Sequence, residues 1–339
     1  MKGVAKLSNG PGDVELIDLP EPEILPGHAI VAVRATGICG TDLHILKGEY
    51  KVTPPVVIGH EVCGLVSEIG EGVDRSWLGK RVVLETFFDT CRQCRYCRGG
   101  RPNLCSSRRS IGTHVNGGMA PWVQVPVSNL HEVPDWLSDY GASLAEPLAC
   151  VCNAVFAYGC AIAPSDNVLV IGPGAIGAVA AQVAKACGAS VVARGTSSDR
   201  GRLDLLQSIG FDCSVAGETA LPPDSFDVVI ECSGNGHGQA DALKALRKGG
   251  RLLQVGLFGK NIDVDFDAVC RKELVVTSGF ASTPASWLQT MALIEKRNVD
   301  LDVLVTEAGS LENWNHLFDS AMAQKGMKYI IDPRLGSAN

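Results

Sequence analysis

The chain has 339 residues, which is longer than a single hydrophobic core usually supports, so we expect two domains or one domain that interrupts another. Hydrophobic residues make up 46% of the chain and charged residues 20%, a balance that is typical of folded proteins rather than disordered ones. A formal net charge of −7 argues against a nucleic-acid partner, and no stretch resembles a signal peptide or a membrane span. We therefore expect a cytoplasmic enzyme that binds neither nucleic acid nor membrane.

The first half of the chain predicts a domain rich in β-strands. Short runs of β-branched and other apolar residues alternate there with Gly and Pro, which interrupt regular structure. The predicted strands of this half are 28–35, 62–69, 81–84 and 122–126.

From residue 167 onward the pattern changes to strands that alternate with helices. Such alternation predicts an α/β domain with a doubly wound parallel sheet. The predicted strands are 168–171, 190–193, 226–232, 251–256 and 274–279, and the predicted helices are 175–187 and 238–246. A further helix at 286–297 and a returning strand at 329–331 follow this block.

The thirteen cysteines include one group with metal-binding spacing. Cys91, Cys94, Cys97 and Cys105 lie three, three and eight residues apart, and four thiolates in so short a span can surround one tetrahedral Zn²⁺. Two disulfides, free core cysteines or an iron–sulfur cluster are the alternatives, although an odd cysteine count and a reducing compartment disfavour disulfides. Because four thiolates leave no open coordination position, we expect this zinc to be structural.

A second possible metal site is dispersed along the chain. Cys39, His60, Glu61 and Glu146 each stand in a short motif, and each taken alone is more often a core residue than a ligand. Together they offer the mixed sulfur, nitrogen and oxygen donors from which catalytic zinc sites are built.

A glycine-rich motif opens the predicted α/β block. Gly172, Gly174, Ala175, Ile176 and Gly177 follow a predicted strand and begin a predicted helix, which is the context required of a dinucleotide site. The first glycine permits a tight turn, the second lets a pyrophosphate approach the backbone, and the third allows close helix packing. The helix N-terminus then faces the phosphates. A glycine-rich turn in an unrelated α/β domain is the alternative.

The end of the second predicted strand bears on the choice of cofactor. NAD-binding proteins normally place an acidic residue there, whereas this chain has Gly195, followed by Thr196 and Ser197. With Arg194 or Arg200 nearby, these small polar residues slightly favour NADP, because they leave room for a 2′-phosphate. The alternative is that both arginines are solvated and that Thr196 or Ser197 binds NAD.

These motifs, in this order, resemble the zinc-containing medium-chain dehydrogenase/reductase superfamily over nearly the whole chain. The matching segments are 37–42, 59–61, 91–105, 146–148 and 172–177. The resemblance implies that Cys39, His60 and Glu146 bind a catalytic zinc, with Glu61 beside it as a ligand or as an exchange partner for water. It also implies that Cys232, Ser233, Val255 and Gly256, at later strand ends, contact the cofactor.

The resemblance further implies hydride transfer between a secondary alcohol of a small polar substrate and NAD or NADP. Zinc acts as a Lewis acid on the alcohol, and Thr41 and His44 match the proton relay of the superfamily; a helix cap and a surface histidine are their alternatives. Relatives that act on simple alcohols usually have cysteine in place of Glu146, so the glutamate resembles the sorbitol (L-iditol) and threonine 3-dehydrogenase branch. A carboxylate ligand leaves zinc more electrophilic, which suits substrates with several hydroxyls.

We therefore expect a polyol or sugar-alcohol dehydrogenase. An L-threonine 3-dehydrogenase-like enzyme is the alternative, and a zinc-stabilised binding module, which explains only the four-cysteine segment, is an alternative of another class.

The expected architecture is a GroES-like β-rich catalytic domain, 1–148 completed by 282–339, with a Rossmann NAD(P)-binding domain at 149–281. Relatives form dimers or tetramers, so we expect a homo-oligomer. Candidates for the substrate pocket are Ile45, Ser110, Thr113 and His114.

Overall fold

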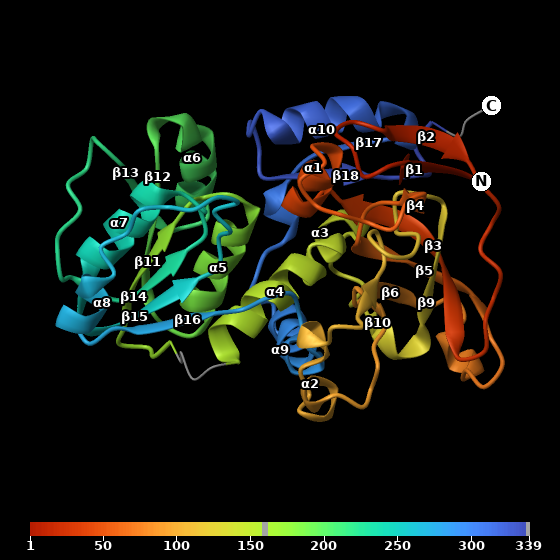
Figure 1. Ribbon diagram of the computed structural model, residues 1–339, viewed down its shortest axis with the longest axis horizontal. Coiled ribbons are helices and arrows are strands. Elements are labelled where there is room, and N and C mark those ends of the chain that lie inside the picture. The colour runs from red at the N-terminus through yellow and green to blue at the C-terminus, as the bar shows by residue number, and fades with distance from the viewer. Residues whose placement is uncertain (158–161, 337–339) are drawn as a thin grey trace. The chain divides into compact units, whose positions relative to one another are not determined.

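The computed structural model describes residues 1–157 and 162–336, and the chain divides into two compact units. The first unit comprises Met1–Glu146 and Leu301–Asn339, and the second comprises Pro147–Asp300. Figure 1 follows the path of the chain through each unit.

The first unit is built on a seven-stranded sheet. Its strands follow the order β10-β6-β5-β3-β18-β17, and β9 pairs with β3 off this path. The bounds are β3 (His28–Gly37), β5 (Glu61–Ile69), β6 (Arg81–Leu84), β9 (Trp122–Pro126), β10 (Leu130–Glu132), β17 (Val305–Gly309) and β18 (Lys328–Ile331). The four strands predicted for this half are confirmed as β3, β5, β6 and β9, and their buried side chains form one hydrophobic core.

The C-terminal strand completes this sheet. β18 runs antiparallel to β3, with Ile330 opposite Gly37, and parallel to β17. All four of its residues are buried, because neighbouring strands flank it on both sides. The predicted returning strand is therefore confirmed.

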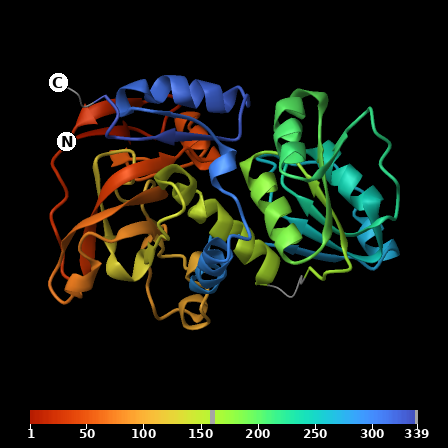
Figure 2. The same cartoon turned by 180° about the vertical axis from the view of Figure 1, so that it is seen from behind.

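A second core of the first unit joins its N-terminal and C-terminal segments. Figures 1 and 2 show the C-terminal helix α10 beside the N-terminal strands from two opposite sides. Val4, Ile45 and Phe318 belong to this one cluster of buried side chains. The elements concerned are β1 (Lys2–Lys6), β2 (Val14–Asp18), β4 (Val56–Val57), α1 (Gly40–Leu46) and α10 (Trp314–Met322).

Shorter elements complete the first unit. β7 and β8 pair in an antiparallel ladder on either side of the cysteine-rich segment that contains α2. The bounds are β7 (Phe87–Asp89), α2 (Arg95–Arg98), β8 (Arg109–Ser110) and α3 (Asp139–Ser143), after which α4 (Ala145–Phe156) leads into the second unit.

The second unit is a doubly wound α/β domain. Its six strands are parallel, in the order β13-β12-β11-β14-β15-β16, and Figure 1 shows α5 and α7 on opposite faces of the sheet. The strand order reverses between β11 and β14, and such sheets bind ligands at the carboxyl ends of the strands beside this point. The strands are β11 (Asn167–Ile171), β12 (Ser190–Gly195), β13 (Asp212–Val215), β14 (Phe226–Glu231), β15 (Leu246–Gln254) and β16 (Val275–Ser278).

The helices of the second unit connect and cover these strands. They are α5 (Ala175–Ala186), α6 (Arg200–Ser208), α7 (Gly236–Ala245), α8 (Asp267–Arg271) and α9 (Pro284–Glu295). In the part of the chain that the structure describes, no helix is long and apolar enough to cross a membrane.

Residues 282–300, which include α9, pack within the second unit rather than with the β-rich domain to which the sequence analysis assigns them. The Asn153 side-chain amide donates to the carbonyl oxygen of Ala281 at 2.8 Å. The Gln182 side chain both accepts from the Asp300 N–H, at 2.6 Å, and donates to the Asp300 carbonyl, at 3.0 Å. These hydrogen bonds tie both ends of the segment to α4 and α5.

Candidate active site

Asp42 connects two loops of the first unit that carry candidate metal ligands. Cys39 caps the N-terminus of α1, and its backbone N–H donates to Asp42 Oδ2 at 2.9 Å. Asp42 Oδ1 accepts from the N–H of Gly59, the residue before His60, at 3.2 Å. Because Asp42 is completely buried, these bonds hold both loops in one arrangement. Asp42 was not among the residues predicted to be functional.

Cys39, His60 and Glu61 converge on one point. Their ligand atoms all lie within 4.8 Å of one another, and His60 and Glu61 are buried. Nδ1 of His60 has no hydrogen-bond partner among the described residues and lies 3.9 Å from Asp42 Oδ1. A thiolate, an imidazole and a carboxylate at this spacing are a donor set that zinc binds.

The charges around His60 also fit a bound cation. Burial lowers the pKa of His60, but the nearby anionic groups Cys39, Asp42 and Glu146 outweigh burial and raise this pKa well above 6.5. For Asp42 the effect of burial is the opposite: burial raises its pKa, and the negative charge of Glu61 raises it further. Negative groups are thus concentrated in a buried space, which a divalent cation stabilises.

Glu146 lies in the first turn of α4 and is buried. It is close enough for its charge to raise the pKa of His60 and of Lys328, but it is not among the three residues whose ligand atoms cluster most tightly. The structure therefore brings Cys39, His60 and Glu61 together and places Glu146 near them.

Lys328 is a functional candidate that the sequence analysis missed. Its Nζ donates to both carboxylate oxygens of Glu61 at 2.6 Å and to the Ile38 carbonyl at 3.1 Å, and both charged side chains are almost fully buried. Burial lowers the pKa of Lys328, but Glu61 and Cys39 outweigh burial and raise it. The sequence feature that could have identified Lys328 is a lysine at the start of the otherwise apolar strand β18.

Thr41 and His44 are both on α1, one helical turn apart. The Thr41 hydroxyl lies 3.7 Å from Cys39 Sγ, beside the candidate metal ligands. His44 is exposed, and its Nδ1 lies 2.6 Å from Glu49 Oε2, an interaction that lowers the pKa of Glu49. A proton relay through these two residues remains a prediction.

The candidate pocket residues fall into two environments. Ile45 is completely buried in the hydrophobic core beneath α1, so it exposes no surface to a substrate. The Ser110 hydroxyl is buried and has no partner among the described residues, and the Ser110 N–H donates to His114 Nδ1 at 3.3 Å. Thr113 Oγ1 lies 2.9 Å from the same His114 nitrogen. This loop reaches the ligand region, because a Cβ at Gly112 would lie 2.7 Å from the Gly59 carbonyl oxygen.

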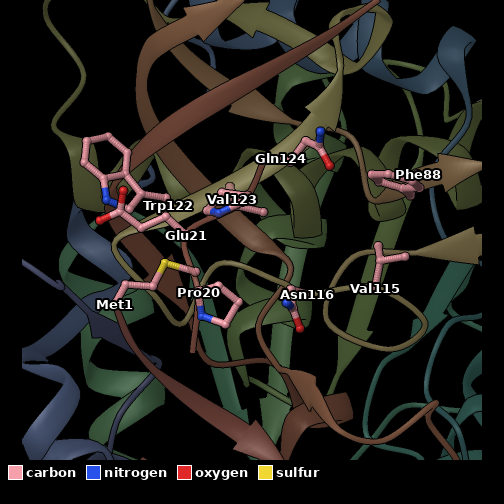
Figure 3. Close-up of a pocket in the computed structure, with 10 residues that line it drawn as sticks. Met1, Pro20, Glu21, Phe88, Val115, Asn116, Trp122, Val123 and Gln124 are labelled. Atoms are coloured by element: carbon pink, nitrogen blue, oxygen red, sulfur yellow. The ribbon is translucent and has the colours of Figure 1, made fainter. Parts of the chain in front are cut away.

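A separate pocket of about 260 Å³ lies elsewhere in the first unit (Figure 3). Figure 3 shows Trp122 and Phe88 among its walls, together with Met1 at the N-terminus. Its lining includes none of the residues that the sequence analysis nominated, so it is not part of the candidate active site.

The four-cysteine segment forms a compact group of sulfurs. Cys105 Sγ lies 3.5 Å and Cys97 Sγ lies 4.0 Å from Cys91 Sγ, close to the edge of about 3.8 Å expected for four sulfurs around zinc. The Cys94 N–H donates to Cys91 Sγ at 3.3 Å, and the backbone N–H groups of Gln93 and Cys94 lower the pKa of the Cys91 thiol to about 6. The group therefore fits a tetrahedral zinc with no position left for a substrate.

In the second unit, the glycine-rich turn lies at the carboxyl end of β11. Gly172 has a φ of +93°, and a Cβ at Gly177 would lie 1.9 Å from the Gly172 carbonyl oxygen. Both positions therefore require glycine. Gly174 precedes α5, where a Cβ would meet no atom within 4 Å, so the backbone is open to a ligand. Ala175 and Ile176 form the first turn of α5 behind it.

Of the two arginines predicted to lie near a 2′-phosphate at the end of β12, Arg194 does not fit the prediction. The Arg194 side chain is buried and donates to Asp241 at 3.0 Å, so it is not available to a 2′-phosphate. Arg200 is exposed and donates to both carboxylate oxygens of Glu218. A Cβ at Gly195 would lie 2.7 Å from the Pro173 ring, so no side chain fits there in this arrangement.

The other residues nominated for the cofactor lie at neighbouring strand ends. Thr196 and Ser197 are exposed after β12. Cys232 and Ser233 follow β14, and Val255 and Gly256 follow β15. All therefore lie at the carboxyl edge of the sheet that carries the glycine-rich turn.

Two family models match the chain. Residues 25–135 match the alcohol dehydrogenase GroES-like domain, and residues 175–296 match zinc-binding dehydrogenase. A solved structure described as a zinc-binding dehydrogenase from Sinorhizobium meliloti 1021, bound to NADP, superposes with a TM-score of 0.88 at 30% identity. The superposition covers 98% of this chain and 99% of that one.

Three curated relatives align with nearly the whole chain. A sorbitol dehydrogenase of Halalkalibacterium halodurans is 34% identical over 98% of this chain and 99% of its own. A D-arabitol-phosphate dehydrogenase of Enterococcus avium is 36% identical over 98% and 97%. An L-threonine 3-dehydrogenase of Salmonella gallinarum is 31% identical over 98% and 99%.

Proposed function

The chain belongs to the zinc-containing medium-chain alcohol dehydrogenase family, and on that premise we propose that it transfers a hydride between a polyol or sugar alcohol and NAD(P). The family makes it a zinc-binding, NAD(P)-dependent dehydrogenase that acts on CH–OH groups. The observation that carries the proposal is the cluster of half-buried Cys39 with buried His60 and Glu61, with the Glu146 carboxylate beside it. The names of two relatives, at 34% and 36% identity, support this substrate class.

Cys39 and His60 hold the catalytic zinc in this proposal, and Glu146 or Glu61 supplies a carboxylate ligand. Bound Zn²⁺ acts as a Lewis acid that lowers the pKa of a coordinated alcohol. Asp42 keeps the two ligand loops at a constant separation, since it accepts a hydrogen bond from each. The buried pair of Lys328 with Glu61 supports Glu146 as the ligand in the resting enzyme, because the Lys328 cation competes with zinc for the Glu61 carboxylate.

The substrate proton leaves through α1 in this proposal. The Thr41 hydroxyl, beside Cys39, is the first acceptor, and His44, which is exposed one turn later, delivers the proton to solvent. Histidine suits this step because its imidazole ring can both accept and release a proton.

A screen of purified enzyme tests the substrate class. Polyols, their phosphate esters and hydroxy amino acids would be oxidised in parallel, with the initial rate of NAD(P)H formation as the readout. We expect the highest kcat/KM with a polyol or a polyol phosphate. Activity confined to L-threonine would instead support the second candidate, which the relative at 31% identity favours.

NADP is the cofactor that we propose over NAD. Thr196 and Ser197 are small, exposed and polar, and exposed Arg200 is adjacent in sequence to their turn. The relative structure at 30% identity was solved with NADP. Initial rates with each cofactor at equal concentration test this choice, and a large preference for NAD would contradict it.

We also propose that the enzyme is a homo-oligomer whose second units associate through β16. This strand is at the edge of the sheet, and Val275 and Val276 expose about half of their surface there. An exposed apolar edge strand favours pairing with a second copy. Light scattering of the protein as it elutes from a size-exclusion column measures its mass. A monomer at micromolar concentration would contradict the proposal.

A further inference from the structure

Glu231 is a buried carboxylate that accepts hydrogen bonds from four donors. It is the last residue of β14, and none of its surface is exposed. Among residues 1–157 and 162–336, no lysine, arginine or histidine forms an ion pair with it. Burying an ionised carboxylate is costly unless hydrogen bonds replace the lost water. The positions of its hydrogen-bond donors therefore indicate which parts of the second unit the Glu231 carboxylate stabilises.

The donors to its carboxylate belong to the turn after β14 and to Gln254, the last residue of β15. Oε1 of Glu231 accepts from the hydroxyl of Ser233 and from its N–H, the latter at 2.8 Å. Oε2 accepts from the Gly234 N–H at 3.2 Å and from the side-chain amide of Gln254 at 2.7 Å. The backbone carbonyl of Glu231 accepts from the Gly256 N–H at 2.8 Å. One residue thus holds both the turn after β14 and the turn after β15.

The turn after β14 contacts the glycine-rich turn on one side and the turn after β15 on the other. A Cβ at Gly172 would lie 2.7 Å from the Ser233 nitrogen. A Cβ at Gly256 would lie 2.3 Å from the Gly234 nitrogen and 2.8 Å from Glu231 Oε2. The backbones approach so closely that no side chain fits between them, and a shift of one turn therefore displaces the next.

We propose that Glu231 is a positioning residue for the nicotinamide cofactor, because its carboxylate holds the turn after β14 in place between the glycine-rich turn and the end of β15. This inference rests on the proposed function, since it takes the edge around Gly172 as the dinucleotide site. The negative charge is required, because four hydrogen-bond donors face the two carboxylate oxygens. An amide of the same size has only one oxygen, so its NH₂ group would face at least one of these donors.

Glu231→Gln tests this requirement. The readout is the dissociation constant of NADH and of NADPH, measured by fluorescence titration without substrate. We expect binding to weaken roughly ten- to hundredfold, the range for buried hydrogen bonds to a charged group. The KM for cofactor should rise while kcat at saturating cofactor stays near that of the wild type. Zinc content should stay at two per chain, because the candidate zinc ligands belong to the first unit.

Two further variants separate positioning from general stability. Asp166→Asn is the matched control, because Asp166 is buried at the opposite end of the sheet, where it pairs with Arg251 at 2.6 Å. It should lower stability without changing cofactor affinity. Ser233→Ala removes the hydroxyl that donates to Glu231 and accepts from the Asn235 N–H, keeps the Ser233 N–H donor, and should fold even if Glu231→Gln does not. We expect it to weaken cofactor binding about three- to tenfold.

The outcomes distinguish the inference from the proposed function. If the wild type binds NAD(P)H and both Glu231→Gln and Ser233→Ala bind it equally well, the inference is wrong and the proposed function stands. An equal loss of affinity in Asp166→Asn would also overturn the inference, because the effect would then be general. If the wild type binds neither reduced cofactor, both fail.

Discussion

Replacing Lys328 with methionine isolates the buried ion pair beside the candidate zinc site. Lys328→Met keeps an unbranched apolar side chain one atom shorter than lysine but removes its charge and its three hydrogen bonds, two to Glu61 and one to the Ile38 carbonyl. Glu61 then remains buried, with 1% of its side chain exposed and no lysine to pair with.

Removal of one partner from a buried ion pair typically costs about 3–5 kcal/mol. We expect a loss of this size in the metal-free protein, because both partners are buried and all three hydrogen bonds are lost. Replacing both partners, as in Lys328→Met with Glu61→Gln, should restore part of the loss, because the remaining amide carries no charge. Zinc should reduce the loss further in the single variant, since the metal gives Glu61 another cation.

Hydrogen exchange of the β18 backbone amides measures this effect within the first unit. Exchange avoids the assumption that a protein of two units unfolds in a single step. In the metal-free form, Lys328→Met should lower the opening free energy of β18 by the amount above, and in the zinc-loaded form by less. By linkage, the variant should then bind zinc at the catalytic site more tightly than the wild type. Unchanged β18 exchange in the metal-free variant would refute the reasoning.

Three other substitutions test the two metal sites and the end of β12. Cys39→Ser should abolish turnover while the far-UV circular dichroism stays unchanged; a near-normal rate would show that the catalytic ligand set is wrong. Cys94→Ser should lower the thermal midpoint and release about one zinc per chain, because it breaks the sulfur group that organises α2; full zinc retention would contradict this. Gly195→Asp should lower the affinity for both cofactors, because its Cβ would lie 2.7 Å from Pro173. A simple gain in NAD binding would show that this turn is free to move.

Features that are encoded within a short stretch of chain were predictable from the sequence. The four cysteines at 91–105 fall within fifteen residues, so the local backbone brings their sulfurs together. The glycine-rich turn is likewise local, and its strand and helix appear as β11 and α5. The alternation of strands and helices after residue 167 predicted the parallel sheet, because βαβ units allow few other arrangements.

Contacts between distant parts of the chain required the tertiary structure. Lys328 and Glu61 are 267 residues apart, and their ion pair depends on β18 returning to lie beside β3. Arg194 was misjudged because a period-two pattern gives the face of a strand without naming its neighbour, which is Asp241 of α7.

The sequence by itself therefore determined the chemistry that this protein carries: two zinc-binding groups, a dinucleotide turn and the two kinds of domain that hold them. The tertiary structure decided which buried charges stabilise these groups. Asp42, Lys328 and Glu231 each act through partners on other loops or strands. The physical reason is that a buried charge depends on the donors and counter-charges within a few ångströms, and only packing determines which residues those are.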